Sequence, residues 1–303
     1  MDNLAAVGCV GLGIAWRWVG WLPSPDHIRR RVAELVFVAF LPLLTFRSMA
    51  NAPVDSALWQ VPLVASLTIG CVLAVAAFWL RHRANLDSRS RAALLLAAAW
   101  GNVTYLGIPV LTATLGPEQV FVAVLFDFAA STPLLWTLGV AVALAQTSES
   151  SHGLVWQRVV LLPPLWAAIA GLLWRYSGAP LSPLADSILA FGARAVIPLM
   201  MFVLGLSLRW EYLRQWRMLL PVAALKLIVA PAVALGLAIA VGISGATLQA
   251  TILEAAMPTM MLVLVVAERF GLATEQVAAA IALTTLASGL TLPLWWLASA
   301  MLV

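Results

Sequence analysis

Residues 101–109 read Gly-Asn-Val-Thr-Tyr-Leu-Gly-Ile-Pro, and this stretch decides the fold. It lies inside a long apolar segment, 92–114, yet it carries two glycines, an amide and a proline. Proline has no N–H and clashes with the preceding helical turn, whereas it is well accommodated at the start of a new helical piece. We therefore expect a helix that is interrupted in the middle of this segment.

The composition around this stretch places the chain in a membrane. Mean hydropathy is +1.00, and 63% of the 303 residues are apolar while 10% are charged, against roughly 25% charged in soluble proteins. Apolar segments of about 20 residues, the length that crosses a bilayer, recur with short polar breaks. The sequence predicts an all-α integral membrane protein with ten transmembrane helices and no soluble domain. The predicted helices cover residues 4–22, 32–49, 58–80, 92–114, 120–145, 159–174, 184–208, 218–241, 247–267 and 277–302.

The two halves of the chain resemble each other. Pro-Leu-Leu-Thr-Phe at 42–46 is echoed by Pro-Leu-Met-Met-Phe at 198–202, and further markers keep nearly the same offset. Because each half holds five helices, an odd number, the second half must insert upside down relative to the first. We therefore predict two inverted five-helix repeats, 1–146 and 158–303, joined by a short central loop at 147–157.

A second interruption is expected in the ninth predicted helix. Residues 254–259 read Glu-Ala-Ala-Met-Pro-Thr and place a carboxylate and a proline at a depth comparable with the first interruption. Non-helical backbone at membrane depth is tolerated only where it is buried in protein or lines a water-filled cavity. The two interruptions therefore predict a cavity between them. The N–H groups that open each second half-helix carry partial positive charge, which favours an anion.

The arginines indicate the orientation of the chain. Basic residues are retained on the cytoplasmic side, and they gather at 29–31, 81–91 and 209–217. Both termini are then expected on the non-cytoplasmic side, which an even number of helices permits. A secretory signal peptide is the rival interpretation of the first helix, but residues 1–12 contain no Lys or Arg for its positively charged start.

These motifs resemble the auxin efflux carrier family, which includes plant auxin exporters and bacterial carriers for malonate and malate. The resemblance is carried by five blocks that span most of the chain, at 40–46, 102–116, 198–206, 226–231 and 255–271. It implies a fold similar to bile-acid symporters and sodium/proton antiporters, in which helices 1, 2, 6 and 7 form a scaffold. Helices 3–5 and 8–10 would form a mobile transport domain, with helices 4 and 9 crossing at their prolines.

The resemblance also implies a homodimer, an elevator-like motion and part of the substrate site. In plant members the asparagine of the fourth-helix motif and the hydroxyl residue of the second-helix motif line that site, and they match Asn102 and Thr45 here. The short centre of this chain is closer to bacterial members, which argues against auxin as the substrate. With the half-helix N-termini added, the predicted substrate-binding residues are Thr45, Asn102, Gly107, Ile108, Pro109, Met257, Pro258 and Thr259.

Charged side chains inside the predicted helices form a second group of candidates, namely Asp127, Arg194, Lys226 and Glu254. A charge at the bilayer centre costs about 2.5–3.5 kcal/mol, so such residues usually face the bundle interior and have partners. We expect Lys226 to replace a bound cation while Asp127 or Glu254 titrates and couples transport to protons; a fixed ion pair is the alternative. Arg47, near the end of the second helix, either snorkels to the interface or guards an anion vestibule.

An enzyme is not expected from this sequence. The histidines His27, His82 and His152 lie in predicted loops, and neither a His-Glu metal spacing nor a Gly-x-Ser-x-Gly elbow occurs. Cys9 and Cys71 lack a paired spacing, so we expect small buried side chains and no metal or cofactor. The net charge of +4 comes from loop arginines, so the expected partner is the lipid bilayer and not nucleic acid.

The sequence therefore predicts a secondary active or facilitative transporter of the cytoplasmic (inner) membrane that moves a small organic anion by alternating access. A membrane receptor or sensor with the same cavity is the alternative, because a binding cavity does not by itself require translocation. An intramembrane enzyme is the weaker alternative.

Overall fold

The computed structural model describes residues 3–17, 19, 24–53, 55–82, 86–145, 162–207 and 216–302. Over these ranges every regular element is helical, and β-pairing is limited to one isolated bridge between Gly101 and Thr259. This is the form that a bilayer allows, since a helix satisfies its own backbone polar groups. The predicted central loop at 147–157 lies outside the described residues, as do the arginines Arg83, Arg209 and Arg214.

Six of the described helices are long and apolar enough to cross a membrane. They are Pro25–Ala50, Ala57–Arg81, Pro117–Leu144, Pro183–Leu206, Trp216–Ala240 and Thr274–Ala300. Their bounds lie close to the predicted ones: the helix expected at 58–80, for example, is α4 (Ala57–Arg81). The prediction of an all-helical integral membrane protein is confirmed, and the arrangement of ten spans in two inverted repeats stays a prediction.

Four prolines of the apolar helices follow stretches of wider, π-helical turn. The π-helical segments η1 (Val36–Phe40), η2 (Val103–Gly107), η4 (Asp127–Ser131) and η7 (Leu225–Val229) are each followed by an α-helix that has a proline in its first two positions. The first residues of an α-helix do not need an N–H donor for its own hydrogen bonds, so the missing N–H of proline costs little there. The fixed φ of proline also matches the φ of a helix. The chain therefore passes these prolines without leaving the helical state.

The chain folds into two compact units. The first comprises Met1–Asp55, Thr104–Val124 and Leu161–Leu208, and the second comprises Ser56–Val103, Leu125–Val160 and Arg209–Val303. The predicted helices 1, 2, 6 and 7 belong to the first unit, whereas the predicted helices 4 and 5 are divided between the two. The roles of scaffold and transport domain stay predictions.

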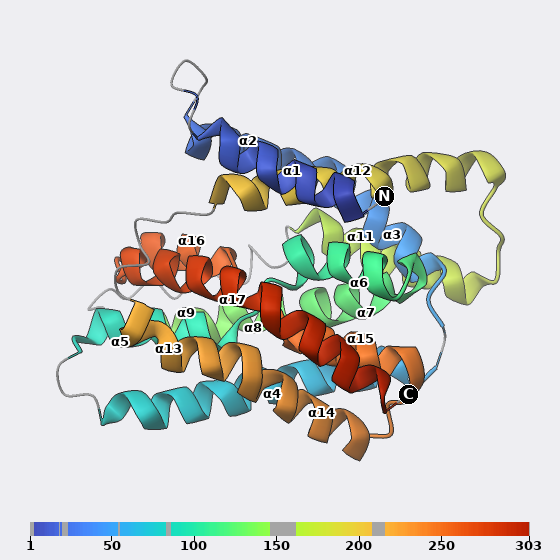
Figure 1. Cartoon of the computed structure of the whole chain (residues 1–303). Helices are drawn as coiled ribbons and strands as arrows, with labels where there is room; N and C mark the ends of the chain where they lie inside the picture. The colour runs from blue at the N-terminus through green and yellow to red at the C-terminus, as the bar shows by residue number, and fades with distance from the viewer. Residues whose placement is uncertain are drawn as a thin grey trace. The chain divides into compact units, whose positions relative to one another are not determined.

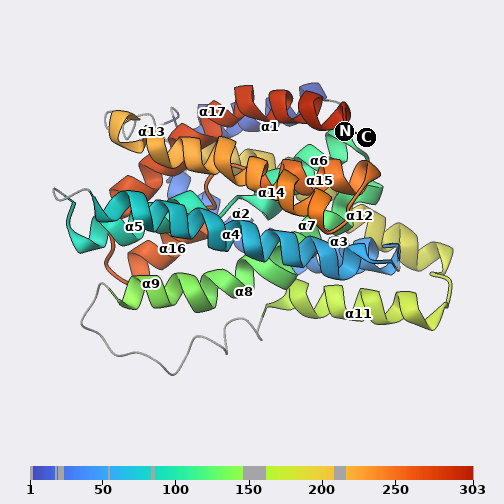
Figure 2. The same cartoon turned by 90° about the horizontal axis from the view of Figure 1, so that it is seen from below.

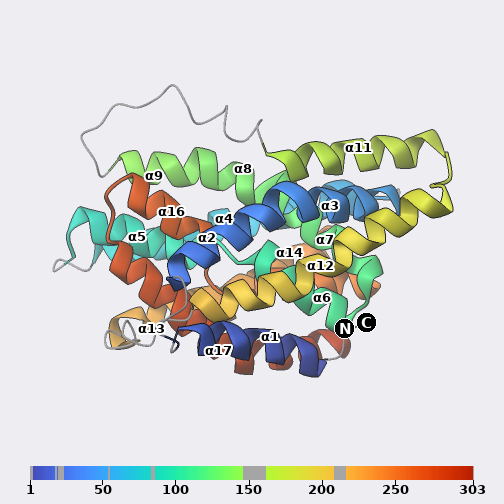
Figure 3. The same ribbon diagram turned by 90° about the horizontal axis from the view of Figure 1, so that it is seen from above.

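In the first unit α1 packs along α12 and α3 packs along α11 (Figures 1 and 3). Small residues allow these close approaches, because a Cβ on Gly13 or Gly205 would collide with the backbone of the facing helix, as would a Cβ on Gly171. Small residues at helix contacts are typical of membrane proteins. The helices of this unit are α1 (Asn3–Trp16), α2 (Pro25–Leu35), α3 (Leu41–Ala50), α6 (Ile108–Thr114), η3 (Pro117–Gln119), α11 (Pro163–Ser177) and α12 (Pro183–Ser207).

In the second unit α4 packs against α5 and α14, and α17 packs against α5, α13 and α15 (Figure 2). Helix α5 is buried along most of its length, so its end lies inside the protein. The remaining elements of this unit are α5 (Ser88–Ala99), α8 (Thr132–Leu134), η5 (Leu135–Gly139), α9 (Val140–Leu144), α13 (Trp216–Ala224), α14 (Ala230–Ala240), α15 (Gly245–Ala255), α16 (Leu262–Arg269) and α17 (Thr274–Ala300). A further helix, α7 (Val120–Phe126), passes from the first unit to the second.

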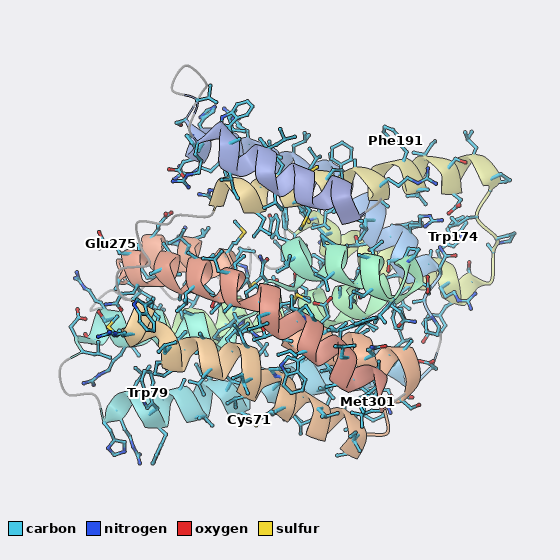
Figure 4. The ribbon with its side chains drawn as sticks, viewed as in Figure 1. Cys71, Trp79, Trp174, Phe191, Glu275 and Met301 are labelled. Carbon is cyan, nitrogen blue, oxygen red and sulfur yellow. The ribbon has the colours of Figure 1, made fainter. Side chains whose placement is uncertain are left out.

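Large apolar side chains are exposed on the outer helix faces, as expected for surfaces that contact lipid. Phe191 on α12 and Met301 after α17 are examples (Figure 4). The free thiol of Cys71 is also exposed, on α4, so the prediction of a small buried side chain is wrong at this position. A thiol behaves as a small hydrophobic group and is therefore tolerated there.

Candidate functional site

The first interruption, defined here as residues 100–102, lies between α5 and η2. Helix α5 ends at Ala99, and Trp100 has an extended backbone with φ −97° and ψ 128°. The side chain of Trp100 is fully buried, and its indole Nε1 donates a hydrogen bond to the carbonyl of Ser131 at 3.0 Å. This anchored ring fixes the direction in which the chain leaves the helix. The next helical segment begins at Val103.

The second interruption, defined here as residues 256–261, lies between α15 and α16. Thr259 holds it in place through two hydrogen bonds to other helices. Its hydroxyl donates to the carbonyl of Ala97 at 2.8 Å, and its N–H donates to the hydroxyl oxygen of Thr284 at 3.0 Å. The bond to Ala97 satisfies one of the last carbonyls of α5, which have no partner inside their own helix.

The two interruptions are joined through their backbones. The N–H of Asn102 donates to the carbonyl of Pro258 at 2.7 Å, and the N–H of Met260 donates to the carbonyl of Trp100 at 2.9 Å. These two bonds flank the isolated antiparallel bridge in the second unit. Non-helical backbone at this depth is thus satisfied by protein, which is the condition under which a membrane protein tolerates it.

The first interruption precedes Gly107, Ile108 and Pro109, where the sequence suggested a half-helix N-terminus. Helical structure has already resumed at Val103, and Pro109 lies in the first positions of α6. All three residues are buried and belong to the first unit. The π-helical turn before the proline explains the difference, because it lets the chain accept Pro109 without a second break.

The predicted residues of the second interruption are also buried, and their backbone donors are occupied. The N–H of Met257 donates to the carbonyl of Glu254, and the N–H of Thr259 donates to Thr284. Pro258 has no N–H to offer. An anion bound here would therefore need donors from side chains.

Asn102 is the polar side chain best placed to offer such donors. It directly precedes η2, where asparagine is favoured because its oxygen can cap the first N–H groups of a helix. The side chain is 1% exposed, yet neither its Oδ1 nor its Nδ2 has a hydrogen-bond partner among the described residues. Buried amides nearly always have partners, so this amide is a candidate ligand-binding group.

Three charged side chains are buried in the part of the chain that the structure describes, and all three lie in the second unit. They are Asp127, Lys226 and Glu254, each at most 2% exposed. Asp127 accepts a hydrogen bond from the hydroxyl of Thr132 at 2.6 Å. Neither carboxylate oxygen of Glu254 has a hydrogen-bond partner within the described ranges. Lys226 bonds to the carbonyl of Ala255, the residue next to Glu254, and the three buried charged side chains are called the cluster below.

Lys226 places its ammonium at the end of α15. Its Nζ donates to the carbonyl of Ala255, the last residue of that helix, at 2.7 Å. A cation is stabilising there because the last carbonyls of a helix lack partners and carry partial negative charge. A Cβ on Gly101 would lie 3.0 Å from Cε and 3.1 Å from Nζ of this lysine, so the glycine of the first interruption makes room for it.

Two further predicted residues, Thr45 and Arg47, lie in the first unit and have structural partners there. The hydroxyl of Thr45 is fully buried and lies 3.1 Å from the carbonyl of Pro164, to which it donates between α3 and α11. Arg47 forms a two-bond ion pair with Asp186, with Nε to Oδ1 at 2.7 Å and Nη2 to Oδ2 at 3.2 Å. Arg47 is therefore neither a lone snorkelling side chain nor a free anion guard.

Other positions differ from the sequence-based expectation. Arg194 is exposed on α12, so the prediction that it faces the interior is wrong. No role was expected from the sequence for Trp100, Thr284 or Asp186. Trp100 and Thr284 hold the two interruptions in place, and Asp186 pairs with Arg47. Trp100 had a readable signal, since it is a large ring with an N–H donor directly before Gly-Asn in the middle of a span. The other two depend on partners far away in the sequence.

Comparison with known proteins places this site in a transporter. The family described as "Membrane transport protein" matches residues 14–296. An uncharacterized transporter of Methanothermobacter thermautotrophicus is 31% identical over 296 residues, covering 96% of this chain and 95% of the relative. An uncharacterized transporter of Methanocaldococcus jannaschii is 28% identical over 223 residues, covering 71% of this chain and 70% of the relative. The chain therefore belongs to the membrane transport protein family of the auxin efflux carrier type and is an integral membrane transporter.

Proposed function

We propose that this transporter moves a small organic carboxylate by alternating access and that the amide of Asn102 binds the carboxylate. The observation that carries the proposal is the buried amide without a partner, held beside a hydrogen-bonded interruption in a transporter. Its Nδ2 can donate to a carboxylate oxygen, and its Oδ1 can accept from a hydroxyl or protonated group on the same molecule. A buried polar group left unpaired costs about 1–3 kcal/mol, so a ligand that supplies partners recovers that free energy.

The backbone on both sides of this amide supports a binding role. The N–H of Asn102 is held by Pro258, and the preceding Trp100 is held through both its carbonyl and its indole. The position of the amide is thus set before a substrate arrives, which lowers the entropy cost of binding. We propose that Met257, Pro258 and Thr259 line the substrate path beside Asn102 in the second unit. Gly107, Ile108 and Pro109 stay proposed substrate-binding residues through their place in the sequence motif.

Thr45 is retained as a proposed substrate contact only through its place in the family motif. Its hydroxyl proton lies between two carbonyl acceptors, Pro164 at 3.1 Å and Pro42 at 3.2 Å. A substrate could therefore use only the remaining lone pairs of that oxygen. Asn102 is the stronger candidate of the two.

We also propose that Asp127, Lys226 and Glu254 couple transport to protons, as opposed to forming a fixed ion pair. The support is their joint burial and the contact of Lys226 with the end of α15, where its ammonium stands in for a bound cation. The remaining proposals follow from the sequence: a homodimer in the cytoplasmic membrane, an elevator-like motion and both termini on the non-cytoplasmic side.

Counterflow in liposomes tests the transport proposal. Purified protein is reconstituted with an excess of unlabelled malonate, malate or indole-3-acetate inside, and the entry of the same radiolabelled compound is followed. Exchange of at least one of these carboxylates is expected. Binding without exchange would favour a receptor, and the absence of both would overturn the choice of carboxylates as the substrate class.

The variant Asn102→Leu tests the proposed contact, with Asn51→Leu as a matched control at an exposed position. Because the Asn102 side chain has no partner among the described residues, an apolar group of similar size should leave the thermal unfolding midpoint unchanged or raise it. Substrate affinity should fall at least about tenfold, which is about 1.4 kcal/mol. The control should keep its affinity. Unchanged affinity in Asn102→Leu would remove this residue from the site.

A further inference from the structure

The buried charges of the second unit do not balance. The cluster of Asp127, Lys226 and Glu254 holds two carboxylates and one ammonium group, so it carries one net negative charge when all three are ionised. Among the described residues no other charged side chain is buried. The helices α4, α14 and α17, which pack against α15, therefore bring no further buried charge to the cluster. The cluster therefore lacks one positive charge.

A net charge on side chains that are buried is expensive. An isolated ionised carboxylate in an apolar interior is disfavoured so strongly that the group usually takes up a proton instead. Removal of one partner from a buried ion pair is strongly destabilising for the same reason. Either a proton or a monovalent metal ion could supply the missing charge.

The hydrogen bonds identify which carboxylate takes up that charge. Asp127 accepts a short hydrogen bond from Thr132, which stabilises its ionised form. The ammonium of Lys226 is directed to the carbonyl of Ala255. Neither oxygen of Glu254 has a donor in the described part of the chain.

We infer that this cluster is a binding site for a single proton, carried by the carboxylate of Glu254. The inference deepens the proton coupling proposed above and rests on it. Glu254 takes the proton from water on one side of the membrane and returns it to water on the other, so no bond other than O–H forms or breaks. A monovalent metal ion is the rival source of the missing charge, and the sodium dependence of the protonated carboxyl group distinguishes the two.

Infrared spectroscopy of the protein in lipid nanodiscs tests this inference without a substrate. Near neutral pH and without sodium, the wild type should show the carbonyl band of one protonated carboxyl group. Labelling with ¹³C-glutamate should shift this band, whereas ¹³C-aspartate should not. Glu254→Gln should abolish the band, and Glu275→Gln, at an exposed glutamate at the start of α17, should leave it intact.

Charge counting makes two further predictions that a purely structural role would not make. Asp127→Asn leaves one ammonium and one carboxylate, so Glu254 should lose its proton and the band should disappear. Lys226→Met leaves two carboxylates without a cation, so the band should grow to about twice its wild-type area. All variants are compared by size-exclusion elution and thermal unfolding, so that a misfolded protein is recognised.

The sequence provides an internal check, because Lys226 is the only lysine in a chain with 17 basic residues. Labelling with ¹⁵N at the lysine side chain therefore gives a single nitrogen signal, and its chemical shift should be that of an ammonium group. A neutral amine would invalidate the charge count. The inference is also overturned if the wild type shows no protonated carboxyl band, if the band belongs to aspartate, or if sodium abolishes it.

Transport measurements separate this inference from the proposed function. With a carboxylate that exchanges in counterflow, Glu254→Gln should lose at least tenfold of the uptake driven by a pH gradient, whereas the control Glu275→Gln should keep it. If the infrared band is present and no carboxylate exchanges, the transport proposal fails and the proton site stands. If exchange occurs and the band is missing, the proton site fails alone.

Discussion

Each compact unit holds a pair of polar side chains singled out by the sequence, and the two pairs differ in their hydrogen bonding. In the first unit the hydroxyl of Thr45 bonds across two helices, and Arg47 bonds to Asp186 through two donors. In the second unit the amide of Asn102 and the carboxylate of Glu254 have no hydrogen-bond partner in the described chain. Polar groups that are satisfied within the protein hold helices together, whereas unsatisfied ones remain available for a substrate or a proton.

The largest effect on stability is expected at the contact between α1 and α12 in the first unit. A Cβ on Gly205 would collide with the carbonyl of Val10, so Gly205→Leu must push the two helices apart. Overpacking of this kind costs about 3 kcal/mol or more in the free energy of unfolding, measurable by detergent titration. Gly8→Leu is the control, since no described atom lies within 4 Å of a Cβ at Gly8.

The comparison of the units predicts opposite outcomes for Thr45 and Asn102. Thr45→Val removes the hydroxyl that bonds to Pro164 and should lower the free energy of unfolding by about 0.5–1.5 kcal/mol, while carboxylate affinity falls much less than in Asn102→Leu. Asn102→Leu should do the reverse. If Thr45→Val unfolds like the wild type but binds substrate more weakly, the polar groups of the first unit are functional as well and the contrast fails.

A smaller effect is expected for the ion pair of Arg47 and Asp186, because both side chains are partly exposed. A double-mutant cycle with Arg47→Gln and Asp186→Asn should give a coupling free energy of about 0.5–1 kcal/mol that falls with added salt. Transport by the double variant should remain near the wild-type rate. A rate that falls for each single variant and for the double variant would instead assign the pair to the anion path.

The smallest effect concerns the exposed start of α5. The side chain and the backbone N–H of Ser90 donate to Asp87 and lower the pKa of that carboxyl. Because this pKa is lower in the folded than in the unfolded state, the ionised carboxyl stabilises the fold at pH values above the pKa of the unfolded chain, about 3.9. This stabilisation is lost as the pH falls through the pKa of the folded state. Unfolding midpoints measured across this range should show a slight acid-dependent loss that is missing in Asp87→Asn.

Six of the ten predicted spans correspond to long apolar helices of the described chain, and the first interruption lies earlier than the half-helix start expected at Gly107. Hydropathy marks segments that must be buried in lipid, so helix existence is readable from composition. The position of the break cannot be read from composition. Pro109 follows a π-helical turn and continues the helix, whereas the chain leaves the helix at Trp100. The break depends on the ring of Trp100 bonding to Ser131, a contact that no local pattern encodes.

The candidate site was predicted in part for the same reason. Asn102, Asp127, Lys226 and Glu254 stand out in sequence because polar residues inside apolar segments are costly. Whether each has a partner depends on residues far away along the chain: Lys226 meets the end of α15, and Arg47 meets Asp186. Residue type therefore identified the candidates, and their surroundings separated structural residues from available ones.

The backbone bonds between the two interruptions have a consequence for hydrogen–deuterium exchange. Irregular stretches usually exchange their amide hydrogens quickly, because they open more easily than helices. Here the amides of Asn102 and Met260 are buried donors that tie two distant segments together. These two amides should exchange as slowly as those in the middle of α5, so the least regular part of the chain should behave as one of its most rigid.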